Sequence, residues 1–184
     1  MTTATVTELI RELKAAGQTL ACCESLSSGL AAAAITSVPG ASAVFRGGLV
    51  TYATDLKATL AGVDPEVLRK VGPVAAETAE QMAAGARKVC GADWAFSLTG
   101  VAGPDPQNGH PVGEVFLGIA GPEGLLHSHR IMPEGQTHLV PGAVDSQPIR
   151  VLNGDRAEIR TRSVEYALQK VLGILLEQKA GKGR

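Results

Sequence analysis

Apolar residues along this chain recur with two periods, and the two periods predict alternating helices and strands. Val6, Leu9, Ile10 and Leu13 fall on one face of a helix, whereas short continuous apolar runs such as 19–23 indicate buried strands. Caps included, the predicted helices are 5–16, 27–37, 54–60, 64–70, 75–90 and 155–178, and the predicted strands are 19–23, 44–53, 94–99, 113–120 and 125–132.

Turn residues refine this pattern. Asp64-Pro65 is typical of a helix start, and Gly121 to Gly124 predicts a hairpin between the last two strands. Gly47-Gly48 indicates a bulge or a close backbone approach inside a strand. The stretch 133–153 is rich in Pro, Gly and polar residues, which predicts a long loop with one short strand near 149–152.

The order of these elements predicts an α/β fold, a three-layer α/β/α sandwich with a mixed sheet. We find no internal repeat and no linker, so residues 1–184 are expected to form one domain. The ordered core is expected over about 5–178, with 179–184 as a flexible tail.

Composition and charge exclude several functions. Net charge is −1 without a basic cluster, and there are only three Phe, two Tyr and one Trp, so a nucleic-acid partner is not expected. No apolar run approaches the roughly 20 residues needed to span a bilayer, and the N-terminus is unlike a signal peptide. Three cysteines, two of them adjacent, predict reduced thiols in a cytoplasmic protein. No metal-ligand spacing is present.

The most informative segment is a hydroxyl-rich turn, 23–29, between a strand and a helix. Backbone N–H groups at a helix start hold anions and can stabilise an oxyanion, so Ser25 is a candidate nucleophile. The alternative is that Ser25 only caps the helix. A nucleophile also needs a base, and no Gly-x-Ser-x-Gly elbow is present.

Lys57 is the candidate base, with Tyr52 beside it at a strand end. Lys57 is expected in the first turn of a helix, near position N3, where the helix dipole and partial burial would lower its pKa. A neutral lysine can accept a serine proton. The alternative is a lysine on a solvated helix face. A nicotinamide dehydrogenase is disfavoured, because the Tyr–Lys spacing is one residue too long and no G-x-G-x-x-G follows a strand.

Other polar residues give weaker signals. The glycines of 99–104 could let the backbone approach a ligand closely. His127 and His129 should share a strand face, but two histidines make an incomplete zinc site. A triad of Ser25, His110 and Asp105 is a further alternative.

Six segments occur in an order that points to a known family. They are Cys23–Gly29, Gly40–Gly48, Tyr52 with Lys57, Gly72–Ala75, Thr99–Pro104 and His110–Val115. In order and spacing, over about 5–178, the chain resembles the CinA C-terminal domain family of PncC-type nicotinamide-mononucleotide amidases.

The resemblance implies hydrolysis of the carboxamide of nicotinamide mononucleotide to nicotinate mononucleotide and ammonia, through an acyl-enzyme. It implies that Ser25 attacks, that Lys57 takes its proton and that Tyr52 relays or orients that proton, with no cofactor and no metal. Amides near 26–28 would hold the oxyanion. The partner would be a small-molecule nucleotide, and the Gly/Ala-rich helices also favour a homodimer. The substrate-binding residues implied are Ser27, Ser28, Arg46, Thr99, Gly100, Ala102 and Gly103, with Arg46 at the phosphate.

Several positions depart from the family pattern. Ser28 stands where the family has glycine, which would narrow the pocket or alter the oxyanion hole. His110 and Glu114 replace lysine and threonine, which would change phosphate recognition. Two alternatives therefore stay open: a nucleotide-binding or interaction module with altered activity, and an amidase for another small amide.

Overall fold

One mixed sheet forms the centre of the molecule. The structure, a computed structural model, describes residues 3–142 and 147–182. Its five-stranded sheet has the order β2-β1-β3-β4-β5. The strands are β1 (Leu20–Glu24), β2 (Phe45–Val50), β3 (Trp94–Gly100), β4 (Val115–Ala120) and β5 (Leu126–Arg130). β1 is parallel to β2 and β3, whereas β4 is antiparallel to β3 and β5, so the predicted mixed sheet and hairpin are confirmed.

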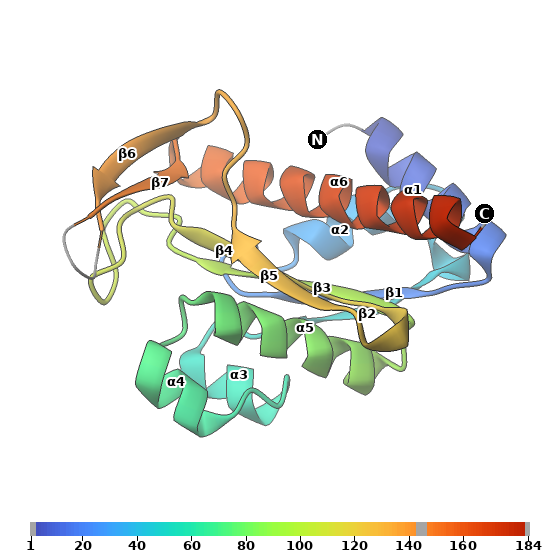
Figure 1. Ribbon diagram of the computed structural model, residues 1–184, viewed down its shortest axis with the longest axis horizontal. Coiled ribbons are helices and arrows are strands. Elements are labelled where there is room, and N and C mark those ends of the chain that lie inside the picture. Colours follow the sequence, from blue (N-terminus) through green and yellow to red (C-terminus); the bar gives the residue numbers. More distant parts are fainter. Residues whose placement is uncertain (1–2, 143–146, 183–184) are drawn as a thin grey trace.

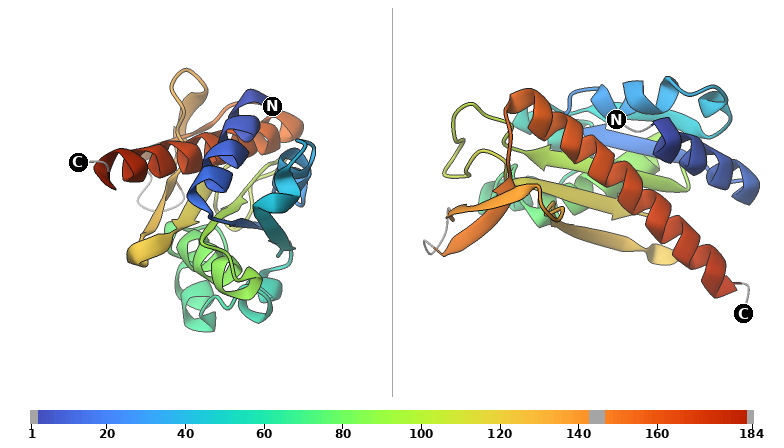
Figure 2. Two further views of the ribbon diagram at one scale, coloured as in Figure 1. Left: turned by 90° about the vertical axis from the view of Figure 1, so that its right-hand side faces the viewer. Right: turned by 90° about the horizontal axis from the view of Figure 1, so that it is seen from above.

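Helices cover both faces of this sheet and complete three layers (Figures 1 and 2). One face carries α1 (Thr3–Ala16), α2 (Leu30–Thr36) and α6 (Arg156–Lys182). The other carries α3 (Thr54–Thr59), α4 (Pro65–Val71) and α5 (Ala76–Cys90). Two short 3-10 helices, η1 (Ala41–Ala43) and η2 (Pro122–Gly124), lie in connections. The predicted α/β/α sandwich is therefore confirmed.

Strand β1 is buried along its whole length because both of its faces are covered. Cys22 belongs to the core under α1, α2 and α6, whereas Cys23 belongs to the core under α4 and α5. The neighbouring strand comes very close here, since a Cβ on Gly48 would lie 2.7 Å from the Cys22 Sγ. The register also shifts beside Gly47, so the prediction of a bulge or close approach in β2 is confirmed.

The stretch 133–153 contains more structure than the sequence indicated. β6 (Thr137–Pro141) pairs antiparallel with β7 (Pro148–Leu152), and residues 143–146 lie outside the described ranges. The short strand expected near 149–152 is β7, but β6 was missed. Its residues are mostly exposed without strict alternation, so no period-2 pattern marks it.

Among the helix boundaries that differ from the prediction, three concern the site or the C-terminal end. α2 begins at Leu30 rather than at Ser27, because Ser28 and Gly29 adopt left-handed φ values of 50° and 94°. Ala53 rather than Thr54 occupies the N-cap of α3. α6 continues to Lys182, into the expected tail, while residues 183–184 lie outside the described ranges.

Candidate active site

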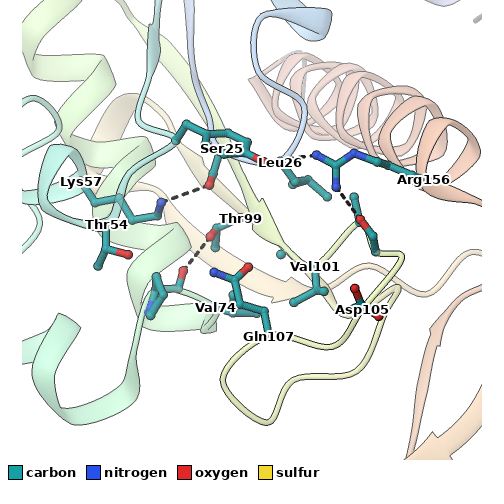
Figure 3. A pocket seen from close by; sticks show the side chains of 15 residues that line it. Ser25, Leu26, Thr54, Lys57, Val74, Thr99, Val101, Asp105, Gln107 and Arg156 are labelled. Atoms are coloured by element: carbon teal, nitrogen blue, oxygen red, sulfur yellow. Dashed lines mark hydrogen bonds between the residues drawn. The ribbon is translucent and has the colours of Figure 1, made fainter.

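The carboxyl ends of the three parallel strands bring the predicted chemistry to one edge of the sheet. Ser25 follows β1, Tyr52 follows β2 by two residues, and Val101 follows β3. Since parallel strands end at the same edge, these segments meet although they are far apart in the sequence. They line a cavity of about 150 Å³ together with residues from α3 and the start of α6 (Figure 3).

Ser25 and Lys57 form a close pair in this cavity. The Lys57 Nζ donates to the Ser25 Oγ at 3.0 Å and to the Thr51 carbonyl oxygen at 2.8 Å. Both side chains are buried: Ser25 is 8% exposed and Lys57 only 1%. The two contacts fix the amine against the hydroxyl, which is the geometry that a serine nucleophile and its base require.

Burial lowers the pKa of Lys57 below its ordinary value, and a weaker Coulombic effect of Cys23 opposes this. Lys57 occupies the fourth position of α3, not the third, and α3 has only six residues. The expected direction is therefore found, but desolvation rather than the helix dipole is its main cause. A lowered pKa raises the fraction of lysine that is neutral and able to accept a proton.

The start of α2 is not the open anion site that the sequence suggested. The buried Glu24 carboxylate accepts hydrogen bonds from the backbone N–H groups of Gly29, Ala31 and Ala32 at 2.9 to 3.0 Å. The chain thus supplies its own anion at this helix terminus. An oxyanion formed at Ser25 must therefore find its donors in the turn before the helix, not at the helix start.

Ser28 does not narrow the cavity. Its side chain is exposed and is not among the cavity-lining residues, while its φ of 50° lies in the left-handed region. Ser27 is fully buried, and within the described ranges its Oγ has no hydrogen-bond partner. Neither side chain lines the cavity, so the sequence-based expectation that they contact the substrate is not supported by their placement.

Replacing Ser28 with glycine should stabilise the protein by about 0.5–1 kcal/mol. The left-handed conformation costs a non-glycine residue roughly 1–2 kcal/mol, and the greater unfolded-state entropy of glycine offsets part of that gain. Urea denaturation measures the difference. Ser42→Gly is the matched control, because Ser42 is exposed with an ordinary φ and its replacement should destabilise. A Ser28→Gly protein no more stable than the parent would contradict the strain argument.

The glycine-rich segment lies where the sequence analysis expected it. Thr99, Gly100, Ala102 and Gly103 all line the cavity, and the buried Thr99 donates its hydroxyl to the Pro73 carbonyl oxygen at 2.6 Å. A Cβ on Gly100 would lie 2.5 Å from the Glu114 carbonyl oxygen, so glycine is required there for packing. This wall of the cavity is therefore built mainly from backbone and small side chains.

Arg156 is a charged cavity residue that the sequence analysis missed. From the first turn of α6 it donates to the Gly103 carbonyl oxygen and, at 3.2 Å, to the Tyr52 hydroxyl (Figure 3). Tyr52 is 58% exposed and lines the cavity, but its hydroxyl bonds Arg156 rather than Ser25 or Lys57. A cation at a helix start is electrostatically unfavourable, and that signal could have marked Arg156 in the sequence.

Arg46, expected at the phosphate, lies elsewhere. It sits at the amino end of β2, the opposite end from Tyr52, and donates to the Cys90 carbonyl oxygen at 3.1 Å. It does not line the cavity. The family motif suggested that Arg46 binds the substrate phosphate. Because Arg46 lies near the start of β2, it is at the opposite edge of the sheet from the cavity.

The histidines do not join the Ser25 site. His110 Nδ1 lies 2.8 Å from the Glu114 Oε2, and Arg130 donates to the other oxygen of that buried carboxylate at 2.7 Å. The alternative triad of Ser25, His110 and Asp105 is therefore wrong, although Asp105 lines the cavity. The expected change in phosphate recognition also loses its basis, since Glu114 is paired internally.

His127 and His129 share one face of β5, as predicted. Their facing ring nitrogens are 3.0 Å apart, and the second nitrogen of His129 lies 3.0 Å from the Tyr166 hydroxyl. Burial lowers the pKa of His129. Over residues 3–142 and 147–182, no group of three or more His, Cys, Asp or Glu side chains is arranged to hold a metal ion.

Comparison with known proteins identifies the family. The model of the CinA C-terminal domain matches residues 2–151. The chain belongs to this CinA family. A CinA-like protein of Frankia casuarinae is 44% identical over 157 residues, which cover 85% of this chain and 32% of that protein. A putative competence-damage inducible protein of Bacillus velezensis is 37% identical, covering 94% of this chain and 38% of its own. The chain thus spans about a third of the length of these CinA relatives.

Solved CinA structures share the fold. The competence/damage inducible protein CihA of Agrobacterium tumefaciens has a TM-score of 0.79 at 31% identity, with 93% of each chain covered. A CinA superfamily protein of Klebsiella pneumoniae has a TM-score of 0.82 at 24% identity, covering 96% of this chain and 99% of that one.

Within the described residues, no helix combines the length and apolar character needed to cross a membrane.

Proposed function

We propose that this chain hydrolyses the carboxamide of nicotinamide mononucleotide to nicotinate mononucleotide and ammonia by a Ser-Lys mechanism. The observation that carries the proposal is the 3.0 Å contact between the Lys57 Nζ and the Ser25 Oγ inside a buried cavity. A buried amine with a lowered pKa, held against one hydroxyl, supports general-base activation of that hydroxyl.

The reaction begins when neutral Lys57 accepts the Ser25 proton. Its other contact, to the Thr51 carbonyl oxygen, holds the amine in place during the transfer. The Ser25 Oγ attacks the amide carbon, and backbone N–H groups of the turn after Ser25 stabilise the oxyanion. Lys57 returns the proton to the leaving nitrogen, so ammonia departs. Water, deprotonated by the same amine, then hydrolyses the acyl-enzyme and releases the carboxylate product.

The cavity size fits a substrate that inserts only its amide-bearing ring. Pockets that enclose a whole drug-sized ligand occupy roughly 300–1,000 Å³, whereas this cavity occupies about 150 Å³. The ribose and phosphate would therefore lie at the mouth, beside the exposed lining residues Asp105, Gln107 and Arg156. Arg156 is the cation suited to the phosphate there, and Tyr52 orients it instead of relaying a proton.

Replacing Arg156 with methionine should raise KM for nicotinamide mononucleotide about 10- to 100-fold and leave kcat nearly unchanged. A charge-assisted contact to a remote phosphate contributes equally to substrate and transition-state binding, and its loss costs about 1.5–3 kcal/mol. Nicotinamide riboside, which lacks the phosphate, is the matched substrate, and its kcat/KM should hardly change. An equal loss for both substrates would contradict the assignment of Arg156 to the phosphate.

Ammonia release tests the proposed function itself. The purified chain should release ammonia from nicotinamide mononucleotide much faster than from nicotinamide or asparagine, because only the nucleotide reaches both Ser25 and the mouth of the cavity. Tight binding of the nucleotide without ammonia release would instead favour the nucleotide-binding module. Faster release from an unrelated amide would favour an amidase with another substrate.

A further inference from the structure

Thr99 lies beside Ser25 on the neighbouring strand. The Ser25 N–H donates to the Leu98 carbonyl oxygen at 2.9 Å, so the pairing of β1 with β3 continues up to the nucleophile. Two residues earlier on these strands, Cys23 packs in the core under α5 and the Ser97 hydroxyl donates to a carbonyl oxygen of α5. Because side chains alternate along a strand, Ser25 and Thr99 face this same side. Both side chains line the cavity (Figure 3).

The Thr99 hydroxyl can only accept a hydrogen bond from a molecule in the cavity. Its oxygen lies 2.6 Å from the Pro73 carbonyl oxygen, and a carbonyl oxygen cannot donate, so the hydroxyl proton must point there. A hydroxyl has one proton and two lone pairs, so the rest of the oxygen is an acceptor. Over residues 3–142 and 147–182, no group is recorded that donates to it. Thr99 is 1% exposed, so only a group inside the cavity can reach it.

We propose that Thr99 selects a primary carboxamide over a carboxylate at the Ser25 site. The NH2 of a carboxamide carries two donors, whereas an ionised carboxylate carries only acceptors. When the amide carbon lies at Ser25, the NH2 can donate to the Thr99 oxygen, which is one strand away. A carboxylate oxygen in the same place meets lone pairs instead. The proposal rests on the proposed function for the identity of the substrate, but the selection applies to any primary amide.

The same contact favours release of the product. Hydrolysis replaces the leaving nitrogen with an oxygen, so the group that donated to Thr99 becomes a group that cannot donate. Leaving a buried polar atom without its partner costs more than the hydrogen bond itself contributes. Thr99 therefore stabilises the bound amide and destabilises the bound acid.

Binding of matched amides and acids to Ser25→Ala proteins tests this role without turnover. Nicotinamide mononucleotide and nicotinate mononucleotide are one pair, and nicotinamide and nicotinate are a second pair that lacks the ribose and phosphate. Thr99→Val removes the oxygen and nearly keeps the shape, whereas Thr99→Ser keeps the oxygen. Thr78→Val is the matched control, because the buried Thr78 hydroxyl donates to the Gly72 carbonyl oxygen at 2.7 Å. It holds the same loop but does not line the cavity.

Calorimetric titration should show that Thr99→Val weakens binding of both amides about 3- to 10-fold, because one hydrogen bond is lost. Binding of both acids should be unchanged or tighter, so the ratio of amide affinity to acid affinity should fall at least about 3-fold. Thr99→Ser and Thr78→Val should keep the ratio of the Ser25→Ala protein. Lys57 is present in every protein compared, so its own preference cancels from these comparisons. A thermal melt checks that each variant is folded.

The outcomes separate this proposal from the proposed function. If the chain with Ser25 releases no ammonia from nicotinamide mononucleotide but Thr99→Val lowers the ratio for nicotinamide and nicotinate, the substrate assignment fails and the role of Thr99 stands. If ammonia is released but Thr99→Val keeps the ratio, the role of Thr99 is wrong and the proposed function stands. Equal weakening of amide and acid, or the same change in Thr78→Val, would show that Thr99 only holds the loop. Absence of amide binding by the Ser25→Ala protein would also overturn the proposal.

Discussion

Replacing Lys57 with methionine is expected to lower the rate of ammonia release from nicotinamide mononucleotide by at least about 10²-fold, and up to about 10⁴-fold. Methionine keeps the length and apolar stem of the side chain but cannot accept the Ser25 proton. Lys57→Arg should be equally inactive, because a guanidinium is always charged and cannot act as a base. A coupled assay for ammonia under saturating substrate measures kcat directly.

The fold of these variants can be checked independently of activity. Lys57 as a whole is 1% exposed, so Lys57→Met removes a group whose charged form is costly to bury. Because the unfolded chain binds the proton more tightly than the folded chain, the parent gains stability as pH rises from the folded pKa of Lys57 to about 10.4. Lys57→Met should lack this gain in stability with pH.

Lys70→Met, at an exposed lysine, is the matched control and should keep full activity. Near-parental activity of Lys57→Met would rule out Lys57 as the base.

Replacing Ser25 with alanine should have the larger effect, a loss of at least about 10⁴-fold in kcat. The nucleophile and the acyl-enzyme disappear together, whereas the nucleotide can still occupy the mouth of the cavity. Mass spectrometry after acid quench should find an adduct equal to the substrate minus ammonia on Ser25 of the parent, and none on the variant.

Ser37→Ala provides the control for this second prediction. Ser37 is an exposed serine at the end of α2, and its hydroxyl only donates to the Ala34 carbonyl oxygen. Its replacement should leave both ammonia release and the adduct unchanged. An active Ser25→Ala protein would mean that water attacks the amide directly, and the acyl-enzyme would have to be abandoned.

The parts of the site that lie at strand ends could be predicted from the sequence. Ser25 and the segment after β3 follow short buried strands, and parallel strands carry such residues to one edge. Cys22 and Cys23 belong to the cores on opposite faces of the sheet, as the two-residue period of a strand requires of adjacent residues. These predictions needed only local pattern and one topological rule.

The parts that depend on tertiary contacts could not be predicted. Arg156 reaches the site from a helix more than a hundred residues away in sequence. Its place at a helix start is an unusual local signal, but that signal does not indicate that α6 crosses this edge. The sequence likewise does not indicate that the Glu24 side chain folds back onto the start of α2. Its carboxylate occupies the anion site that was predicted there. The prediction for Arg46 was wrong because it followed the family motif and ignored the direction of β2, which places Arg46 at the other end of the strand. The homodimer and the cytoplasmic location stay predictions.

The protonation state of Lys57 is the point on which the mechanism depends. A nuclear magnetic resonance titration of the lysine Cε carbons, with the Lys57 signal assigned by its absence in Lys57→Arg, measures that state directly in the folded protein. We expect a midpoint clearly below the ordinary lysine value of about 10.4, and loss of catalytic activity as pH falls through that midpoint. A Lys57 signal that titrates at or above the ordinary value, in a protein still active at neutral pH, would contradict the mechanism.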